Sequence, residues 1–442
     1  MRRLHALDPV ACRAGVVLLA SDNPPRQLAR CKADPAHWGR AIRSEPYGKR
    51  RRFRRGLQCA RIPAPSTTMS TSHIQSTVAG HAGLITLDRA RALNALSLPM
   101  IRSLTGILRS WHEDPDVRVI GIRGMHRDSA SGAEWPFGAF CAGGDIRFFH
   151  QAALAGNPEL EDFFTEEYTL NHLLHRYPKP VIAFMDGIVM GGGMGIAQGA
   201  RMRIATERTK MAMPETNIGL FPDVGGGFFL GRCPGHLGEY LALTGHMLGG
   251  AQAVQAGLAD GVLASERQRD LWDSLSTLSR PDPHSVRAWI GEQLQVGGGA
   301  PIAPAGAVER FFSLPTVSAI VHALEAAAAT DPWARDTAAA LRQRSPLMLH
   351  VALEQVRRGR QMDIAEDLRM ERDLVRHSFH PSHLGRAGAT TDTVEGIRAL
   401  AVDKDHRPRW NPPRIEDVTP EMVAPFFHSP WPAHAHPLRD LV

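Results

Sequence analysis

Short apolar runs alternate with longer helical patterns from about residue 74 onward. The short runs predict strands at residues 83–87, 117–123, 180–185, 202–206 and 210–213. Apolar residues at helical spacing, such as Ile101, Leu104, Leu108 and Trp111, predict helices at residues 98–112, 159–176 and 194–200, and from about residue 146. Strands that alternate with helices indicate a layered α/β architecture.

The first 70 residues differ from the rest, because they are rich in Arg and Pro and show no sustained periodicity. Residues 1–68 hold 15 Lys and Arg against 4 Asp and Glu, whereas the remaining chain holds 36 basic and 41 acidic residues. The net charge of +6 therefore comes from this segment and does not indicate nucleic-acid binding by the body. Three interpretations stay open: a disordered extension, an Arg-rich transit peptide, or an upstream extension of a chain whose translation starts at Met69.

The length of 442 residues predicts one large domain and a smaller second one. We expect an N-terminal extension over residues 1–70, an α/β core over 71–295 and a helical C-terminal region over 296–442, which opens with a Gly/Pro/Ala linker. No apolar run reaches the roughly 18 residues of a membrane span, so we expect no membrane partner. Five scattered cysteines favour a reducing compartment, cytoplasmic or, if the N-terminus is a transit peptide, the mitochondrial matrix.

The stretch from Met213 to Gly227 holds the most informative chemistry. It sets Glu215 and Asp223 around a short apolar run that a proline and three glycines interrupt. Carboxylates beside apolar residues are costly unless they are solvated, paired or used. Two carboxylates in one pocket can divide acid, base and nucleophile roles, because their surroundings separate their pKa values.

Two glycine-rich turns precede that stretch, at residues 141–145 and 190–193. Glycine turns can bring backbone N–H groups close to a ligand. Exposed amides together with carboxylates are what acyl-transfer chemistry requires. Cys141 in the first turn is interpreted as a small buried residue rather than a nucleophile. The 21 histidines form no zinc-like cluster, so no metal or redox cofactor is expected, and His434 and His436 are expected to be solvated.

From residue 74 to about 425 the chain resembles the crotonase (enoyl-CoA hydratase/isomerase) superfamily, and within it the 3-hydroxyisobutyryl-CoA hydrolases. The order and spacing of several short motifs are the basis of the resemblance. The motifs are Arg91–Leu96, Phe140–Arg147, Glu166–Asn171, Lys179–Pro180, Met190–Gly193, Met213–Gly227, Leu241–Gly245, Glu395–Ala399 and Asp403–Asp405. The resemblance implies a spiral core of ββα units followed by a C-terminal helical region.

The resemblance also implies residue roles. The peptide N–H groups of Gly144 and Gly192 would form an oxyanion hole, with Glu215 and Asp223 as the catalytic carboxylates. Many hydratases carry a catalytic Glu at the position of Gly195 and commonly a Gly at that of Asp223, so the pattern favours thioester hydrolysis over hydration. We expect hydrolysis of 3-hydroxyisobutyryl-CoA in valine breakdown, with Glu215 as nucleophile or general base and Asp223 as acid/base partner.

For CoA the resemblance suggests the backbone of Arg91, Ala92 and Leu93 at the adenine, and Arg147 and Lys404 near the phosphates. Each of these charges is explained equally well as a surface residue. Glu167 and Tyr168 are candidates for the acyl pocket, although helix packing explains them too. Apart from the acyl-CoA substrate no partner is expected; a homo-oligomer is left open. Hydration or isomerisation of an enoyl-CoA, and non-catalytic binding of CoA esters, stand as alternatives.

Overall fold

The structure is a computed structural model that describes residues 69–71, 73–126, 138–278 and 282–442. These residues belong to one compact unit that spans residues 64–442. The basic N-terminal segment and most of a polar loop after Gly124 lie outside the described residues.

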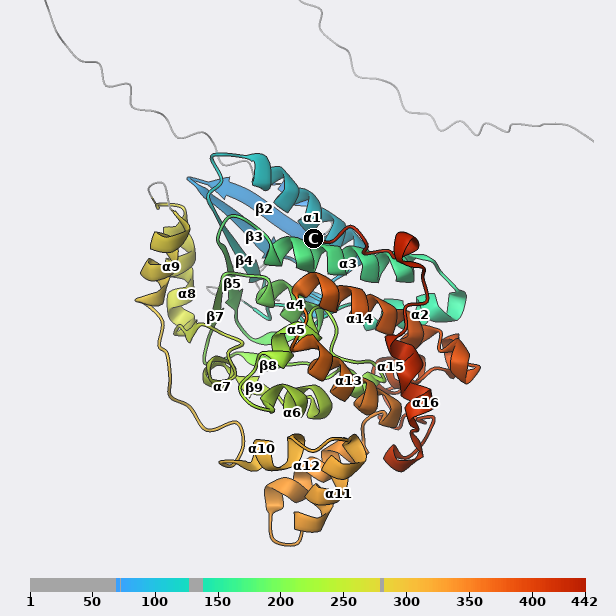
Figure 1. Ribbon diagram of the computed structural model, residues 1–442. Helices are drawn as coiled ribbons and strands as arrows, with labels where there is room; N and C mark the ends of the chain where they lie inside the picture. Colours follow the sequence, from blue (N-terminus) through green and yellow to red (C-terminus); the bar gives the residue numbers. More distant parts are fainter. Residues whose placement is uncertain (1–68, 72, 127–137, 279–281) are drawn as a thin grey trace, which may run out of the picture. The chain divides into compact units, whose positions relative to one another are not determined.

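Helices make up much of the described chain (Figure 1). The α-helices are α1 (Leu98–Glu113), α2 (Ile146–Ala155), α3 (Glu159–His175), α4 (Gly192–Gln198), α5 (Gly226–Gly231), α6 (Leu237–Thr244), α7 (Gly250–Gln255), α8 (Gln268–Leu275), α9 (Pro283–Gly291), α10 (Ala307–Phe312), α11 (Val317–Ala327), α12 (Pro332–Arg342), α13 (Pro346–Gly359), α14 (Ile364–Phe379), α15 (Asp392–Ile397) and α16 (Pro420–Val423). The 3-10 turns include η1 (Ala90–Ala92), η3 (Glu215–Ile218), η4 (Ser265–Arg267), η5 (Ser382–Leu384), η6 (Gly388–Thr390), η8 (Ile415–Asp417), η9 (Ala424–Phe427) and η10 (Ala433–Ala435). A π-helical turn, η7, covers Arg398–Val402.

Within the described ranges the strands form two sheets. They are β1 (Met69–Thr71), β2 (Ile74–Ala79), β3 (Ala82–Leu87), β4 (Val119–Gly124), β5 (Val181–Met185), β6 (Ile188–Met190), β7 (Met202–Ala205), β8 (Lys210–Ala212), β9 (Leu248–Gly249) and β10 (Gly261–Val262). The larger sheet has the order β1-β2-β3-β4-β5-β7-β10, and the smaller sheet has the order β6-β8-β9.

From β5 to β8 successive strands alternate between the two sheets. β5 lies in the larger sheet and β6 in the smaller one, and α4 follows; β7, β8 and η3 repeat the arrangement. The strands from β3 to β10 run parallel in the larger sheet, whereas β1 and β2 extend it in antiparallel fashion. This repetition is the spiral of ββα units that the sequence predicts, so the α/β fold class is confirmed.

Helices cover both faces of the larger sheet. Side chains of β5 alternate between two hydrophobic clusters, one on each face. Phe184 faces Trp272 of α8, with ring centroids 5.3 Å apart. Met185 belongs to the opposite cluster, which α1 and α3 share. Figure 1 shows α8 and α9 on one side of the sheet and α1 and α3 on the other.

The predicted elements agree closely with the structure, and the differences have local causes. The helix expected from residue 194 begins at Gly192, because the last two glycines of the triplet lie inside the first turn of α4 and Gly191 is its N-cap. The predicted apolar stripe of α1 is buried. Residues 297–306 contain no helix or strand. The predicted division at residue 296 stays a prediction.

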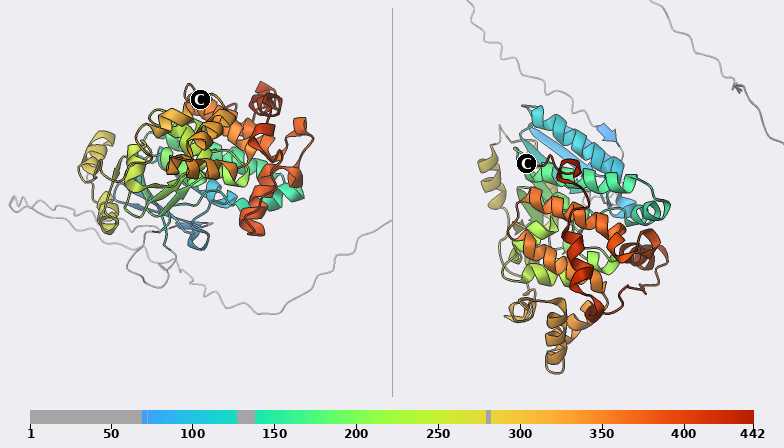
Figure 2. Two further views of the ribbon diagram at one scale, coloured as in Figure 1. Left: turned by 90° about the horizontal axis from the view of Figure 1, so that it is seen from below. Right: turned by 45° about the vertical axis from the view of Figure 1, so that its right-hand side comes forward.

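The C-terminal helices pack directly on the core. α13 contacts α5 and α6, and α14 contacts α3 and α5. Figure 2 shows the orange helices against the green elements in both views. Asp363 and Glu366 start α14 with a reciprocal capping box, in which Glu366 N–H donates to Asp363 Oδ1 at 2.8 Å and Asp363 N–H donates to Glu366 Oε2 at 2.9 Å.

Candidate active site

Three chain segments meet at the carboxyl ends of the smaller sheet. β6 and β8 are parallel and pair Met190 with Ala212. Cys141 forms a parallel bridge with Val189 of β6. Because parallel segments end at the same edge of a sheet, both glycine turns and Glu215 emerge together.

The two glycine turns pack against each other. Gly143 has a φ of +101° and Gly191 a φ of +47°, which favour glycine. A Cβ atom on Gly143 would lie 3.3 Å from the carbonyl oxygen of Met190 and 3.6 Å from the amide nitrogen of Gly192. The backbones therefore approach within a few ångströms of each other.

This packing leaves two backbone N–H groups without acceptors among the described residues. Leu96 forms a parallel bridge with Gly144, but the two bonds use Gly143 O and Asp145 N. Gly192 is the first residue of α4, where an N–H has no intrahelical acceptor. Neither N–H donates to a described group, so both are free to bind a ligand oxygen.

A cavity of about 250 Å³, the central cavity, lies at this junction. Its polar wall consists of Gly144, Gly192, Glu167, Asn217, Glu215 and Asp223. Its apolar wall includes Ile146, Phe149, Leu220 and Leu400. The structure thus brings both predicted carboxylates, both predicted amides and Glu167 to one cavity. No side chain can replace Gly192 without movement, because its Cβ would lie 2.3 Å from Glu167 Oε1.

Burial shapes the charges of the three carboxyl groups. It raises the pKa values of Glu215 and Glu167 well above their usual range, and the nearby charge of Asp223 adds to both shifts. Burial also raises the pKa of Asp223 to about 6, while a hydrogen bond from Tyr168 limits the increase. Asp223 is therefore the most readily ionised of the three carboxyl groups.

Tyr168 and Val224 fix the position of Asp223. Tyr168 Oη donates to Asp223 Oδ2 at 2.9 Å, and both side chains are buried. Val224 follows with a φ of +59°, a conformation that is strained for a β-branched residue. Surrounding contacts must hold this strained turn in place.

Carboxylates of α14 supply those contacts. Glu371 accepts hydrogen bonds from the N–H groups of Gly225, at 2.7 Å, and Gly227, at 3.0 Å. Asp367 accepts from the N–H of Phe228 at 2.9 Å. Gln355 of α13 donates to Glu371 Oε1 at 2.9 Å. The C-terminal helices therefore hold the backbone next to Asp223, which the sequence reasoning missed because nothing in the pattern of α14 sets these two acids apart.

The residues predicted for CoA lie beside the central cavity rather than in its wall. Arg91 and Ala92 end η1, and Leu93, which is 46% exposed, follows with a φ of +51°. Leu93 O accepts a hydrogen bond of 3.0 Å from Ala142 N–H, next to the first glycine turn. Arg147 is exposed and follows Ile146, which lines the cavity. Their roles stay predictions.

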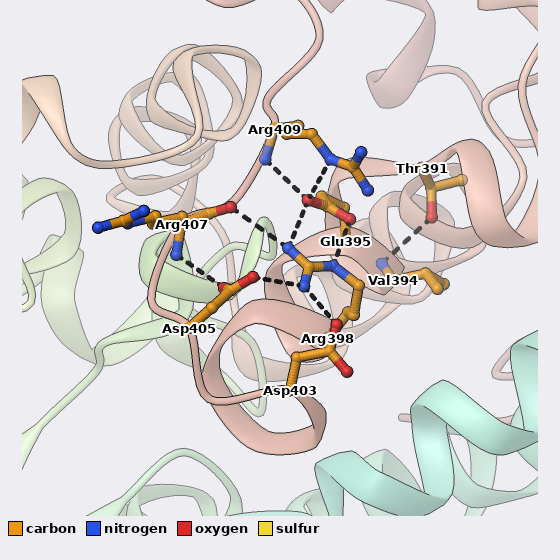
Figure 3. Close-up of polar contacts among 8 residues, drawn as sticks. All are labelled: Thr391, Val394, Glu395, Arg398, Asp403, Asp405, Arg407 and Arg409. Atoms are coloured by element: carbon orange, nitrogen blue, oxygen red, sulfur yellow. Dashed lines mark hydrogen bonds and ion pairs between the residues drawn. The ribbon is translucent and has the colours of Figure 1, made fainter.

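Leu400 was not predicted, yet it lines the central cavity from the π-helical turn η7. Figure 3 shows Arg398 at the centre of a cluster of polar contacts that surrounds this turn. The Arg398 guanidinium pairs with Glu395 at 2.9 Å, Asp403 at 2.5 Å and Asp405 at 2.8 Å. These contacts connect η7 to the segment that carries the exposed Lys404.

The structure also tests the predictions for Cys141 and His436. Cys141 is buried, as predicted, and burial raises its pKa to about 12. The prediction of a solvated His436 is wrong: it is buried, and its Nδ1 accepts from Leu438 N–H at 3.0 Å.

Across the described ranges there is no group of three His, Cys, Asp or Glu arranged to hold a metal ion. None of the described helices has the length and apolar character that a bilayer crossing requires.

Comparisons with known proteins agree with this geometry. A family model described as enoyl-CoA hydratase/isomerase matches residues 82–427. A carnitinyl-CoA dehydratase from Mycobacterium thermoresistibile has a similar structure, with a TM-score of 0.72 and 33% identity over 84% of this chain and 99% of its own. Together with the ββα spiral and the paired amides, these matches show that the chain belongs to the enoyl-CoA hydratase/isomerase (crotonase) family.

Within that family the chain is similar to hydrolases. A probable 3-hydroxyisobutyryl-CoA hydrolase from Arabidopsis thaliana is 37% identical over 78% of this chain and 88% of its own length. A mitochondrial 3-hydroxyisobutyryl-CoA hydrolase from Xenopus tropicalis is 39% identical over 80% of this chain and 88% of its own. The predicted resemblance is confirmed.

Proposed function

We propose that this chain hydrolyses the thioester bond of 3-hydroxyisobutyryl-CoA and releases 3-hydroxyisobutyrate and CoA, a step of valine breakdown. The main observation is the convergence of two unpaired N–H groups with Glu215 and Asp223 in one cavity. The similarity to hydrolases of this name supports the choice of substrate.

The thioester oxygen binds to the N–H groups of Gly144 and Gly192. Charge on this oxygen increases as the carbonyl carbon becomes tetrahedral, so the two amides stabilise the transition state more than the substrate. Loss of one such donor costs roughly 3 kcal/mol in other enzymes.

Asp223 prepares Glu215 for reaction. In the resting enzyme the charge lies on Asp223, so transfer of a proton from Glu215 to Asp223 ionises Glu215 without adding a second charge to the cavity. Ionised Glu215 then attacks the carbonyl carbon or deprotonates a water molecule that does so. The C–S bond breaks, and Asp223 passes the proton to the CoA sulfur. On the nucleophilic route the acyl group is then bound to Glu215 as an anhydride. A water molecule gives a proton to Asp223, its oxygen bonds to the acyl carbon, the bond to the Glu215 oxygen breaks to release the acid, and Asp223 returns the proton to Glu215.

The remaining groups orient the substrate. Glu167 faces the cavity beside Gly192 and binds the 3-hydroxyl group of the acyl chain. The backbone of Arg91, Ala92 and Leu93 receives the adenine, and Arg147 and Lys404 interact with the phosphates, since guanidinium and ammonium groups suit phosphate oxygens. Every step uses this chain, the acyl-CoA and water, so the proposal includes no cofactor.

The closest alternative is hydration of an enoyl-CoA. The hydratase glutamate would stand at Gly195, but a Cβ atom there would lie 2.7 Å from Val224 Cβ and 2.9 Å from Asn171 Nδ2. The site therefore has no room for that glutamate in its present conformation, which favours hydrolysis. Non-catalytic binding of CoA esters is the other alternative.

One assay separates these functions. A panel of short acyl-CoA esters, with and without a 3-hydroxyl group, is scored for free CoA with a thiol reagent. We expect release from the branched 3-hydroxyacyl ester to be the fastest. Hydration of an enoyl-CoA without thiol release, or binding without turnover, would contradict the proposal.

The proposal extends to the compartment and the assembly of the protein. We infer a reducing compartment, the cytoplasm or the mitochondrial matrix, and a homo-oligomer is compatible with the function. Fractionation of cells that express the full chain distinguishes the two compartments, and light scattering measures the assembly.

A further inference from the structure

A second cavity of about 250 Å³, the rear cavity, lies behind the catalytic segments. Asn171, Gly195 and Val224 line it. Each is a close neighbour of a residue in the central cavity: Asn171 lies one helical turn after Glu167, Gly195 lies in the same short helix as Gly192, and Val224 follows Asp223. The two cavities therefore adjoin along α3, α4 and the Asp223 loop.

Close packing at Gly195 forms part of the wall between the cavities. A Cβ atom there would lie 2.7 Å from Val224 Cβ and 2.9 Å from both amide atoms of Asn171. The Asn171 amide and the Val224 side chain therefore contribute to this wall.

Asn171 is 3% exposed, and neither its Oδ1 nor its Nδ2 bonds to any group in the described part of the chain. A buried amide without partners costs about 1–3 kcal/mol. Such groups are normally satisfied by ordered water, provided that the site is polar and roomy. The rear cavity meets both conditions, because Gln198, Arg203 and the exposed Arg232 also line it.

The central cavity is lined by further buried polar atoms of this kind. Glu167 Oε1 and Glu215 Oε2 are buried and also lack partners among the described residues. Glu167, Asn171 and His175 lie at four-residue intervals on α3, so they share one face of that helix. This polar face extends from the central cavity into the rear cavity.

We propose that the rear cavity binds water and delivers it past Asn171 to the carboxylates of the central cavity. This inference rests on the proposed hydrolase function. Each turnover consumes one water: its oxygen bonds to the carbonyl carbon, the C–S bond breaks, one proton goes through the carboxylates to the CoA sulfur, and the acid product keeps the other oxygen-bound hydrogen until it ionises. The acyl-CoA fills the central cavity, so water reaches the carbonyl carbon from the side of the rear cavity. Asn171 is a positioning residue in this path.

Two substitutions at Asn171 separate an effect on water supply from an effect on packing. Asn171→Leu keeps the branching of the side chain and removes both polar atoms, so it blocks the path and replaces a buried amide with an apolar group. Asn171→Ser opens space and keeps a hydroxyl, so water still passes although packing worsens. We expect Asn171→Leu to lower kcat about tenfold with KM changed less than twofold and the melting temperature unchanged or higher. Asn171→Ser should keep kcat within about threefold while the melting temperature falls.

Thr169→Val is the matched control, since Thr169 lies on the same helix and, among the described residues, its Oγ1 bonds only to Thr165 O, at 2.7 Å. Wild-type turnover in Asn171→Leu, or an equal loss of kcat in both Asn171 variants, overturns the water path. A wild-type protein that releases no CoA from any ester instead contradicts the proposed function. In that case a crystal structure decides the path: ordered water bonded to both Asn171 amide atoms supports it, and water on neither atom overturns it.

Discussion

The phenolic Oη of Tyr168 donates a hydrogen bond of 2.9 Å to Asp223 Oδ2 in a buried environment. This bond favours the ionised form of Asp223 and so opposes the effect of burial on its pKa. Tyr168→Phe removes the donor, and the pKa of Asp223 should rise above its present value of about 6. The loss of kcat/KM in acid should therefore occur at a higher pH.

A pH–rate profile measures that shift. Tyr177→Phe is the matched control, because Tyr177 is also buried and its Oη donates to Leu108 O at 2.6 Å, away from the central cavity. An acid limb at the wild-type position in Tyr168→Phe would show that this bond does not control Asp223.

Replacement of Asp223 by Asn should stabilise the protein while it inactivates the enzyme. The pKa of Asp223 is raised from 3.8 to about 6 in the folded state. Folding therefore favours the protonated form, and the ionised form destabilises the fold as pH rises from about 4 to above 6. At pH 7.5 the substitution should add at most about 3 kcal/mol of stability.

Chemical denaturation at pH 7.5 and pH 4 tests this sign. The gain should be present at pH 7.5 and much smaller at pH 4, where the carboxyl is protonated in the folded state and only partly ionised in the unfolded state. A destabilised variant at pH 7.5 would mean that Asp223 is stabilised by contacts stronger than its burial penalty.

Glu215→Gln should remove turnover and leave substrate binding intact. The substitution keeps the shape of the side chain but prevents its ionisation, so neither attack nor base catalysis remains. We expect kcat to fall about 10³-fold or more, with little change in the Kd of a non-hydrolysable CoA thioether. Glu354→Gln, which alters a surface pair with Arg358, is the control.

Gly192→Ala should disable the oxyanion hole through a steric effect. The new Cβ would lie 2.3 Å from Glu167 Oε1, so the turn or Glu167 must move. We expect kcat/KM to fall about 10²-fold to 10³-fold. Gly291→Ala provides the comparison, because a Cβ at Gly291 meets no atom of the described residues within 4 Å. Equal activities of the two variants would remove the Gly192 amide from the mechanism.

Arg398→Gln should loosen the wall of the central cavity rather than change its chemistry. Arg398 bonds to Glu395, Asp403 and Asp405, and its turn carries Leu400 into the cavity. We expect KM to rise several-fold with kcat changed less than about threefold. Arg414→Gln, which breaks a local pair with Asp417, should change neither constant. A selective loss of kcat in Arg398→Gln would indicate a direct part in the reaction.

Local sequence patterns were enough to predict most of the core, because apolar periodicity and glycine turns act over short distances. The stripe of Ile101, Leu104, Leu108 and Trp111 is buried as expected, and the strand at 181–185 lies within one residue of its predicted bounds. The family resemblance then indicated which glycines and carboxylates converge. The structure places Glu215 and Asp223 at one cavity, although their chemical roles stay predictions.

What the sequence could not predict depends on contacts between distant segments. Glu371 lies more than 140 residues from the amides of Gly225 and Gly227 that it binds, and no periodicity connects them. His436 looked like a residue of a solvated proline-rich tail, yet its Nε2 lies 3.3 Å from Asp373 Oδ1. Leu400 lines the cavity from the π-helical turn η7, which no sequence pattern predicts.

Glu371 and Asp367 of α14 accept hydrogen bonds from the amides that follow Asp223, so the catalytic segments depend on the C-terminal helices. A fragment ending near residue 295 would retain every glycine and carboxylate assigned to the reaction, yet the strained turn at Val224 would lose its restraint. Premature termination anywhere before α14 should therefore abolish activity, and a shortened version of this protein is not a simpler enzyme with a smaller scaffold.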